Sequence, residues 1–435
     1  MRSTQRKQSQ RQRMLSATID VAARHGYQAT TIGRIVAQAG VSRPTFYDYF
    51  PNRDSCLLAT VTTVNEQVLA EVTQRVDAQP PEHAAYAAVE AIFDFCVEVP
   101  TMARFLVDAS LAGPAQISEA RSDGIAAIAR AVDDAYRALS AQALVPDIES
   151  SVLIAGILRL LGLSLRRDAT PDRRMLATVL SWIESYAVPA ADRRWMTLRG
   201  FARRSSHIMS EPPFGRPPVV TQHDFPGGKL EYARQRLLFA AGQLSESKGF
   251  GPVTLAAITA RARVNYRVFR RLFASKGDLF VTLLEIGSRR TLATTFSAYF
   301  DPGAWPERVW AAGRAYTQFV ASNPTIAHVG FVDSYASGPR AAEAMDKTLK
   351  AFTLFLADGD GHVATGRECP PQLARDAIAA TIFDLGYAHC RSGKSTELTD
   401  LLPQAVFIAL TPYLGPDRTL EFIDSKLAAL QGAVA

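Results

Sequence analysis

The chain has 435 residues, of which 48% are hydrophobic and 21% charged, and its formal net charge is +6. This length exceeds one ordinary hydrophobic core and predicts roughly two to four domains, while the composition is that of a soluble globular protein. The polar, basic N-terminus predicts no secretory signal peptide. The longest apolar stretch, residues 152–165, is short and contains Arg159, so we interpret it as a core helix rather than a membrane span.

Cysteine and histidine spacing indicates no metal site. The four cysteines lie far apart with no CxxC pair, which argues against zinc and a disulfide scaffold and fits a reducing cytosol. The seven histidines do not cluster, and no Ser/His/Asp arrangement is recognisable. We therefore expect a cytoplasmic protein that is not an enzyme and binds neither metal nor cofactor. The cysteines are Cys56, Cys96, Cys369 and Cys390.

The basic residues are concentrated in two segments. Residues 1–57 carry a net charge of +6 and residues 229–280 a net charge of +7, so the remaining residues carry a net charge of −7. Two compact basic segments on an otherwise acidic protein are typical of surfaces that bind a polyanion. Charge alone leaves open the alternative that both segments are only solvated faces.

Periodicity predicts helices along almost the whole chain, beginning with residues 11–25. Apolar residues recur there at spacings of three and four, and Gly26 supplies a stop signal. Thr31 is placed to cap a second helix, residues 32–38, in which Ala37 is small enough to let two helices cross closely. No alternating apolar and polar run suggests a sheet, so the predicted fold class is all-α.

A tight turn is predicted after the second helix. Gly40 can adopt a positive φ there. Ser42 then caps a short third helix that runs through Tyr49, with Phe46 and Phe50 pointing inward. Two helices joined by so short a turn form the helix-turn-helix pattern of DNA-binding proteins.

The third helix is predicted to present a DNA-reading face. Arginine can pair with guanine in a bidentate way, threonine can contact a thymine methyl group, and tyrosine hydroxyls suit phosphates. The basic residues before Arg11, which include Arg2, Arg6 and Lys7, predict an arm that follows the phosphate backbone or enters the minor groove. The outward residues are Arg43, Pro44, Thr45, Tyr47, Asp48 and Tyr49.

The first basic segment resembles the TetR family of one-component regulators through the run TTIGRIVAQAGVSRPTFYDYFPNRDSCL, residues 30–57. The resemblance implies a three-helix DNA-binding head, an all-α effector-binding and dimerisation body, and homodimers that release DNA when a small ligand binds. It also implies that the positions of Thr31, Tyr47 and Arg53 contact phosphate. The matching residues are Thr31, Ala37, Gly40, Val41, Ser42, Phe46, Tyr47, Tyr49, Phe50, Asn52 and Arg53.

The first head is repeated later in the chain. Residues 11–57 align without gaps on residues 234–280 at an offset of 223, with 13 of 47 positions identical. Such similarity at a fixed offset is the sequence signature of a repeated structural unit. Between the copies, residues 203–228 contain five prolines and are predicted to be an extended linker.

The repeat continues into the bodies. Gly113-Pro114 matches Gly338-Pro339 at an offset of 225, and Leu161-Gly162 matches Leu385-Gly386 at an offset of 224. The near-constant offset predicts that head and body were duplicated together.

The second head differs from the first at its turn and on its outward face. Gly40 is replaced by Arg263, which costs roughly 1–2 kcal/mol if the backbone there has a positive φ. Asn265 remains a good helix cap, and the arginines at 267, 270 and 271 add positive charge. The residues predicted to contact DNA here are Thr254, Asn265, Tyr266, Arg267, Arg270, Arg271 and Lys276.

These observations predict a sequence-specific transcriptional regulator, by resemblance a repressor relieved by an effector, whose two unlike heads read an asymmetric operator. The alternative is that only the first head binds DNA and the second copy is a degenerate dimerisation partner. The predicted partners are double-stranded DNA, a small apolar or aromatic effector and the chain itself, as an intramolecular pseudo-dimer, with no membrane. The predicted domains are the first head (1–57), first body (58–202), linker (203–228), second head (229–280) and second body (281–435).

Overall fold

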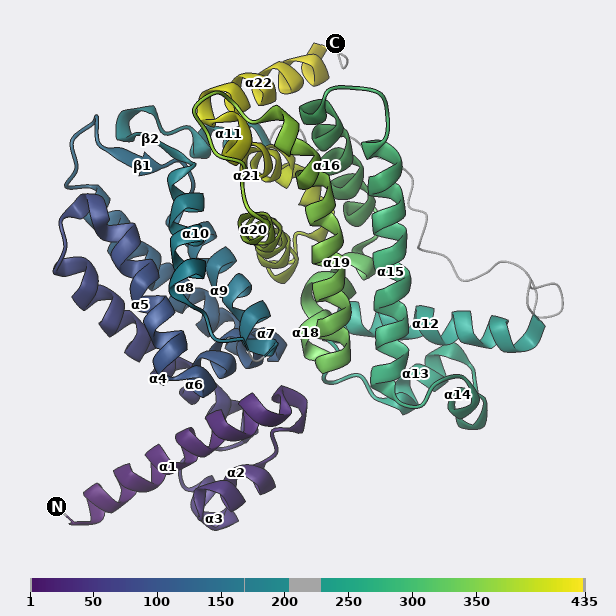
Figure 1. The fold of residues 1–435 in the computed structure, drawn as a ribbon. Helices are drawn as coiled ribbons and strands as arrows, with labels where there is room; N and C mark the ends of the chain where they lie inside the picture. The colour runs from purple at the N-terminus through teal and green to yellow at the C-terminus, as the bar shows by residue number, and fades with distance from the viewer. Residues whose placement is uncertain (1, 168, 203–227, 433–435) are drawn as a thin grey trace. The chain divides into compact units, whose positions relative to one another are not determined.

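The computed structural model describes residues 2–167, 169–202 and 228–432 (Figure 1). These residues are predominantly helical, which confirms the all-α prediction with one exception. Strands β1 (Leu144–Pro146) and β2 (Ala187–Pro189) pair antiparallel, with Val145 opposite Val188. This sheet was not predicted, because a strand of three residues is too short to show alternation of apolar and polar residues.

The described residues form two compact units, and neither is continuous in sequence. Unit 1 comprises Met1–Met196, Val363–Asp384 and Thr411–Glu421. Unit 2 comprises Thr197–His362, Leu385–Leu410 and Phe422–Ala435. The domain boundaries expected from the sequence stay a prediction, and the expected linker lies outside the described residues except for Gly228.

Unit 1 begins with the three helices of the first head and continues with a helical body. The head helices are α1 (Arg2–His25), α2 (Ile32–Ala39) and α3 (Arg43–Tyr47), with the 3-10 turn η1 (Tyr27–Ala29) after α1. The body elements are α4 (Arg53–Asp77), η2 (Pro81–His83), α5 (Ala84–Glu98), α6 (Pro100–Arg104), η3 (Phe105–Ala109), α7 (Ser110–Ala112), α8 (Ala115–Tyr136), α9 (Ser150–Arg166), α10 (Arg173–Glu184) and η4 (Ala190–Asp192).

Unit 2 begins with a similar succession of helices, although its described residues have no counterpart of η1, η2 or the sheet of β1 and β2. Its head helices are α12 (Gly228–Lys248), α13 (Leu255–Ala262) and α14 (Tyr266–Leu272). Its body contains α15 (Lys276–Tyr299), α16 (Trp305–Ala321), α17 (Pro324–Ala327), η5 (His328–Asp333), α18 (Ser334–Ala336), α19 (Pro339–Ala357), η6 (Asp358–His362) and η7 (Ser395–Leu401). The remaining helices cross the division into units and are α11 (Trp195–Ala202), α20 (Gln372–Arg391), α21 (Leu402–Leu414) and α22 (Pro416–Gly432).

The two halves of the chain, residues 2–202 and 228–432, share an irregular detail. Both bodies contain one π-helical segment, η3 in the first half and η5 in the second, between two short α-helical pieces. The π-helix is rare and is used mostly as an isolated turn within α-helices. Asp108 and Asp333 occupy these segments at the offset of 225 found in the sequence.

The core of the first head explains why its short helices form. Met14, Ile35 and Phe46 are fully buried together, and Phe50 is nearly so, as the sequence predicted for both phenylalanines. Burial of such side chains stabilises elements that are too short to be helical alone. The small residue at the helix crossing is the buried Ala39, whereas the predicted Ala37 is exposed.

Two expectations about the bulk of the chain are confirmed. The apolar stretch 152–165 lies within α9, whose Ile157 and Leu161 are fully buried. All four cysteines are free. Among the described residues, none of the helices combines the length and apolar character needed to cross a membrane.

Candidate nucleic-acid interface

The first head has the capped turn that its sequence predicts. The hydroxyl of Thr31 accepts a hydrogen bond from the Arg34 amide at 3.3 Å, and that of Ser42 accepts one from the Thr45 amide at 3.1 Å. Gly40 ends α2 with φ 61°, in the left-handed region that glycine tolerates best. The turn therefore holds α2 and α3 as a helix-turn-helix, with both helix starts satisfied.

Both ends of the first head differ from the predicted bounds. The first helix begins at Arg2 instead of Arg11, so the expected basic arm continues α1. Residues 2–10 contain no glycine or proline and are rich in arginine, lysine and glutamine, which favour helix. The third helix ends at Tyr47 instead of Tyr49, a difference of two residues that is common at helix ends.

The outward face of α3 carries one cation. Arg43, Pro44 and Asp48 are exposed, and the Tyr47 side chain is 56% exposed. Thr45 is half-buried, and its hydroxyl is 2.8 Å from that of Ser42. This face offers an arginine and a tyrosine to a DNA groove, with a carboxylate beside them.

Two residues expected to contact DNA are bonded within the first head. The Tyr49 hydroxyl donates to Gln10 Oε1 at 3.0 Å, which ties the residue after α3 to α1. Arg53 donates to the Tyr27 hydroxyl at 2.7 Å and to Asp54 at 2.8 Å. The Arg53 guanidinium also lies over the Tyr27 ring, 4.5 Å from its centre. Both side chains hold the head together, and their predicted contacts with DNA stay a prediction.

The turn of the second head is capped in the same way as that of the first, but arginine instead of glycine occupies its left-handed position. Thr254 accepts from the Ala257 amide at 3.2 Å, and Asn265 accepts from the Val268 amide at 2.9 Å. Arg263 has φ 50° and ψ 44° and is the sole non-glycine residue with positive φ among those described. The second head therefore carries the backbone strain that its sequence predicts, roughly 1–2 kcal/mol.

The outward face of α14 is strongly basic. Arg267, Arg270 and Arg271 are exposed, and the Tyr266 side chain is 58% exposed. Arg270 also donates to the carbonyl oxygen of Ala274, just beyond the helix. No carboxylate lies on α14 itself, in contrast to Asp48 after α3.

Lys276 occupies the position of Arg53 and is likewise bonded internally. Its ammonium donates to the carbonyl oxygens of Phe250 and Val253, each at 2.9 Å, and lies 4.0 Å from the centre of the Phe250 ring. Partial burial lowers the pKa of Lys276, although the charge of Asp333 opposes this. The ammonium stabilises the loop between α12 and α13, and its predicted contact with DNA stays untested.

A buried carboxylate that was not predicted joins the second head to its body. Asp333 in η5 accepts hydrogen bonds from the Phe250 amide, at 3.0 Å, and from the Ser245 hydroxyl. Burial raises the pKa of Asp333 to about 7, against the opposing effect of those hydrogen bonds and of the charges on Arg391 and Lys276. The equivalent Asp108 bonds instead to Arg166 of its own body, at 2.5 Å.

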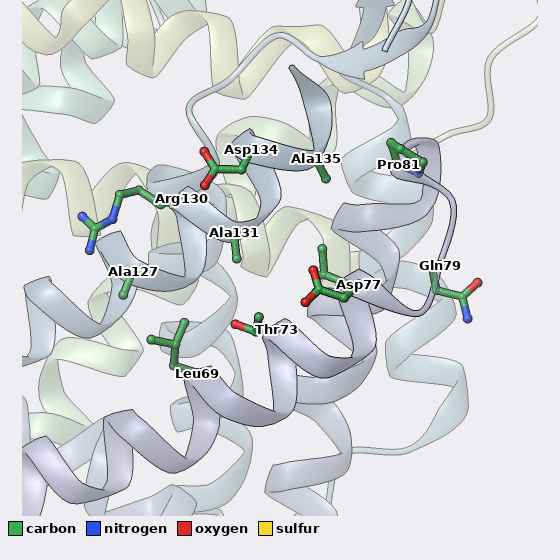
Figure 2. Close-up of a pocket in the computed structure, with 11 residues that line it drawn as sticks. Leu69, Thr73, Asp77, Gln79, Pro81, Ala127, Arg130, Ala131, Asp134 and Ala135 are labelled. Carbon is green, nitrogen blue, oxygen red and sulfur yellow. The ribbon is translucent and has the colours of Figure 1, made fainter. Parts of the chain in front are cut away.

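A cavity of about 620 Å³ lies in the first body between α4 and α8 (Figure 2). Its wall is partly apolar and partly charged, and it contains no aromatic side chain. Phe93 and Phe105 of the same body are buried in its core. The lining residues are Leu69, Thr73, Val76, Asp77, Gln79, Pro81, Ala127, Arg130, Ala131, Asp134 and Ala135.

Comparison with protein families supports the reading of the first head. Residues 14–60 match the model described as "Bacterial regulatory proteins, tetR family". No curated protein matches the chain. With the capped turn between α2 and α3, the family match defines a DNA-binding helix-turn-helix head of a transcriptional regulator.

Similar solved structures come from several bacteria. The fatty acid degradation regulator FadR from Bacillus halodurans is 18% identical with a TM-score of 0.36, and covers 40% of this chain and 96% of its own. A TetR family transcription regulator from Marinobacter aquaeolei VT8 is 22% identical with a TM-score of 0.35, and the match covers 43% of this chain and 98% of that protein's chain. FadR from Bacillus subtilis, solved with stearoyl-CoA, is 15% identical with a TM-score of 0.36, and the match covers 40% of this chain and 96% of that protein's chain.

Proposed function

We propose that this protein regulates transcription by binding one asymmetric operator through two unlike heads in a single chain. The observation that carries the proposal is the second head. It keeps the capped helix-turn-helix frame, with Thr254 and Asn265 as caps, while α14 exposes three arginines. The caps would stabilise the helices of a passive packing partner as well. Such a partner would, however, have no physical reason to gather three exposed cations on one face.

We propose further that the two halves are duplicated TetR-like units that pair with each other as an intramolecular pseudo-dimer. The repeated order of helices, including the π-helical segments η3 and η5, supports the duplication. Helix-turn-helix dimers place their recognition helices on half-sites about 34–36 Å apart, and equal helices read a palindrome. Because α3 and α14 differ in sequence, the two half-sites of this operator differ.

The two heads contribute unequally to affinity. Each phosphate neutralised by a lysine or arginine lowers the slope of log K against log salt by about 0.9, whichever base is present. The second head offers three exposed arginines on α14, and the first head offers one on α3. The second head therefore supplies more of the salt-dependent binding.

The proposed regulation is repression that a small-molecule effector relieves. The first-head resemblance supports it, and α4 supplies a physical route. The N-terminal Arg53 of α4 bonds to Tyr27 in the head, and Leu69 and Thr73 on the same helix line the cavity of Figure 2. A ligand that displaces α4 in the cavity changes the position of the helix start beneath the first head.

Selection of bound sequences from random DNA with the whole protein, followed by footprinting, tests the proposal. The expected product is one site with two unlike halves, and a perfect palindrome would overturn it. The double variant Arg267→Ala and Arg271→Ala should make the salt slope less negative by about 2. Arg289→Ala, which removes an exposed charge on α15, is the matched control and should leave the slope unchanged. If the double variant also leaves it unchanged, the alternative of a passive second head is correct.

A further inference from the structure

A buried charge cluster lies in the body of unit 1. It joins Arg121 of α8, Arg159 of α9 and Asp384 of α20, which are 5%, 2% and 5% exposed. Arg159 Nε donates to Asp384 Oδ1 at 2.7 Å, and Arg121 Nη2 donates to Asp384 Oδ2 at 3.3 Å. Although burial opposes it, the two guanidinium groups hold the pKa of Asp384 below its ordinary value. One buried carboxylate thus serves two buried cations.

The cluster draws its cations from the first half of the chain and its anion from the second. At the offset of 224 that relates α9 to α20, Asp384 corresponds to Leu160, and Arg159 corresponds to Phe383. At the offset of 225 that relates α8 to α19, Arg121 corresponds to Asp346. None of these positions carries the same charge in both halves.

Pairing of like halves would separate Arg121 and Arg159 from Asp384. Two first halves would bring Arg121 and Arg159 to Leu160, and two second halves would bring Asp384 to a position held by aspartate. A buried charge that loses its partner is strongly destabilising, far more than the net gain from making the pair. The cluster therefore penalises both symmetric pairings and spares the asymmetric one.

The helix contact beside the cluster is also asymmetric. A Cβ atom at Gly156 of α9 would lie 2.0 Å from the Thr381 hydroxyl oxygen and 3.0 Å from the Thr381 Cα of α20, which only glycine permits. The position equivalent to Gly156 in the second half is Ala380. The close approach of α9 to α20 thus depends on which half supplies which helix.

We propose that Arg121, Arg159 and Asp384 specify the pairing of the two unlike halves. They direct the chain to pair with its own second half and exclude a second copy from the same face. The inference rests on the proposed pseudo-dimer and adds the residues that select the partner. It does not depend on the identity of the operator.

Charge reversal in the full-length chain tests the selection. Arg159→Glu makes the facing positions of both halves acidic, and Asp384→Arg makes both basic. Each variant alone should unfold at a temperature lower by roughly 10 °C. The double variant should recover as a single chain. An equimolar mixture of the two single variants should form a 1:1 complex of twice the mass in light scattering, because each half then finds its opposite charge on the other chain.

A second set of variants replaces the charged residues with methionine, because the charge-reversed side chains could fail to fit in the buried site. Asp384→Met alone should unfold at a lower temperature, because two buried cations lose the carboxylate that both of them contact. The triple variant Arg121→Met, Arg159→Met and Asp384→Met should regain the wild-type value. The proposal is overturned if Asp384→Arg and Asp384→Met unfold like the wild type. It is also overturned if the single variants are destabilised and none of the double variant, the mixture and the triple variant recovers.

These measurements use no DNA, so they separate the inference from the proposed function. An asymmetric operator with an insensitive Asp384 would leave the function standing and refute the pairing role. A palindromic operator with the expected charge-reversal behaviour would do the opposite.

Discussion

Both heads turn between their second and third helices through a left-handed residue, but the first uses Gly40 at φ 61° and the second uses Arg263 at φ 50°. The helix that follows the turn is anchored in the same way in both heads, since the equivalent residues Phe46 and Phe269 are both fully buried. The packing of the helices thus fixes the backbone of the turn, and the residue that occupies it adapts. The second head therefore carries the backbone strain of a left-handed arginine, and Arg263 adds an exposed cation at its turn.

The heads also differ in how they meet their bodies. In the first, the half-buried Arg53 at the start of α4 bonds to the buried Tyr27. In the second, Lys276 at the start of α15 and the buried Asp333 both bond to Phe250 in the loop after α12. The first arrangement keeps its charges partly in water, and the second depends on a carboxylate removed from water. The same fold therefore joins head to body with two different responses to pH.

The largest effect is expected from removing the buried phenylalanine of one head. Phe46→Ala should cost the first head about 3–5 kcal/mol, because it leaves a cavity among Met14, Ile35 and Phe50. Footprinting should lose one half-site and keep the other, and the matched Phe269→Ala should show the reverse. Loss of both half-sites in each variant would mean that the heads do not fold independently of one another.

A pH-dependent effect is expected from Asp333→Asn. The pKa of Asp333 in the folded protein is about 7, above its ordinary 3.8, so the folded state holds this proton more tightly than the unfolded state. The protonated Asp333 therefore contributes stability that is fully present below about pH 4 and is lost as the pH rises through about 7. The variant should lack this fall when unfolding is measured by urea titration across that range.

The groups that face Asp333 are His328, Lys276 and Arg391. Burial and then the charge of Arg391 lower the pKa of His328 to about 4, so its contribution rises with pH and is present in both proteins. The difference between wild type and variant therefore isolates Asp333. Asp108→Asn, at the equivalent position beside Arg166, is the matched control. Parallel curves for wild type and Asp333→Asn would refute the prediction.

A smaller effect is expected from Arg43→Ala. Loss of one arginine that pairs with a base should weaken binding to the selected operator by about 1–3 kcal/mol and relax preference at one base pair of one half-site. Fluorescence titration against operators changed at single positions measures both quantities. Equal loss on an operator whose first half is scrambled would show that Arg43 contacts only phosphate.

The smallest effect is expected at the strained turn. Arg263→Gly should relieve the left-handed backbone and stabilise the second head by up to about 1 kcal/mol, since the greater freedom of glycine in the unfolded chain offsets part of the gain. Gly40→Ala should destabilise the first head by a similar amount. Thermal unfolding of the two variants compares the turns directly, and a lower midpoint for Arg263→Gly would contradict the expected strain.

The sequence was most informative where one residue determines local geometry. The caps Thr31, Ser42, Thr254 and Asn265 and the left-handed position of Gly40 follow from side-chain chemistry within four residues, and the structure has them all. Helix bounds were less predictable. The start of α1 depends on modest propensities summed over many residues, which set no sharp boundary.

Long-range contacts were out of reach of sequence patterns. Asp333 and Ser245 are 88 positions apart, and Arg159 and Asp384 are 225 positions apart. Nothing local to those residues indicates that they meet, because an aspartate within a helix usually faces solvent. The internal bonding of Arg53 and Lys276 was missed for the same reason, since charge alone favoured an outward role.

The unequal recognition helices α3 and α14 give the proposed complex a direction. A homodimer on a palindrome can bind in two orientations that are identical, so it cannot distinguish upstream from downstream. In the proposed complex, a single chain with one singly charged and one triply charged reading helix would bind in one orientation only. The same side of the protein then always faces the neighbouring gene, and reversing the operator in place would reverse the side presented to the transcription machinery.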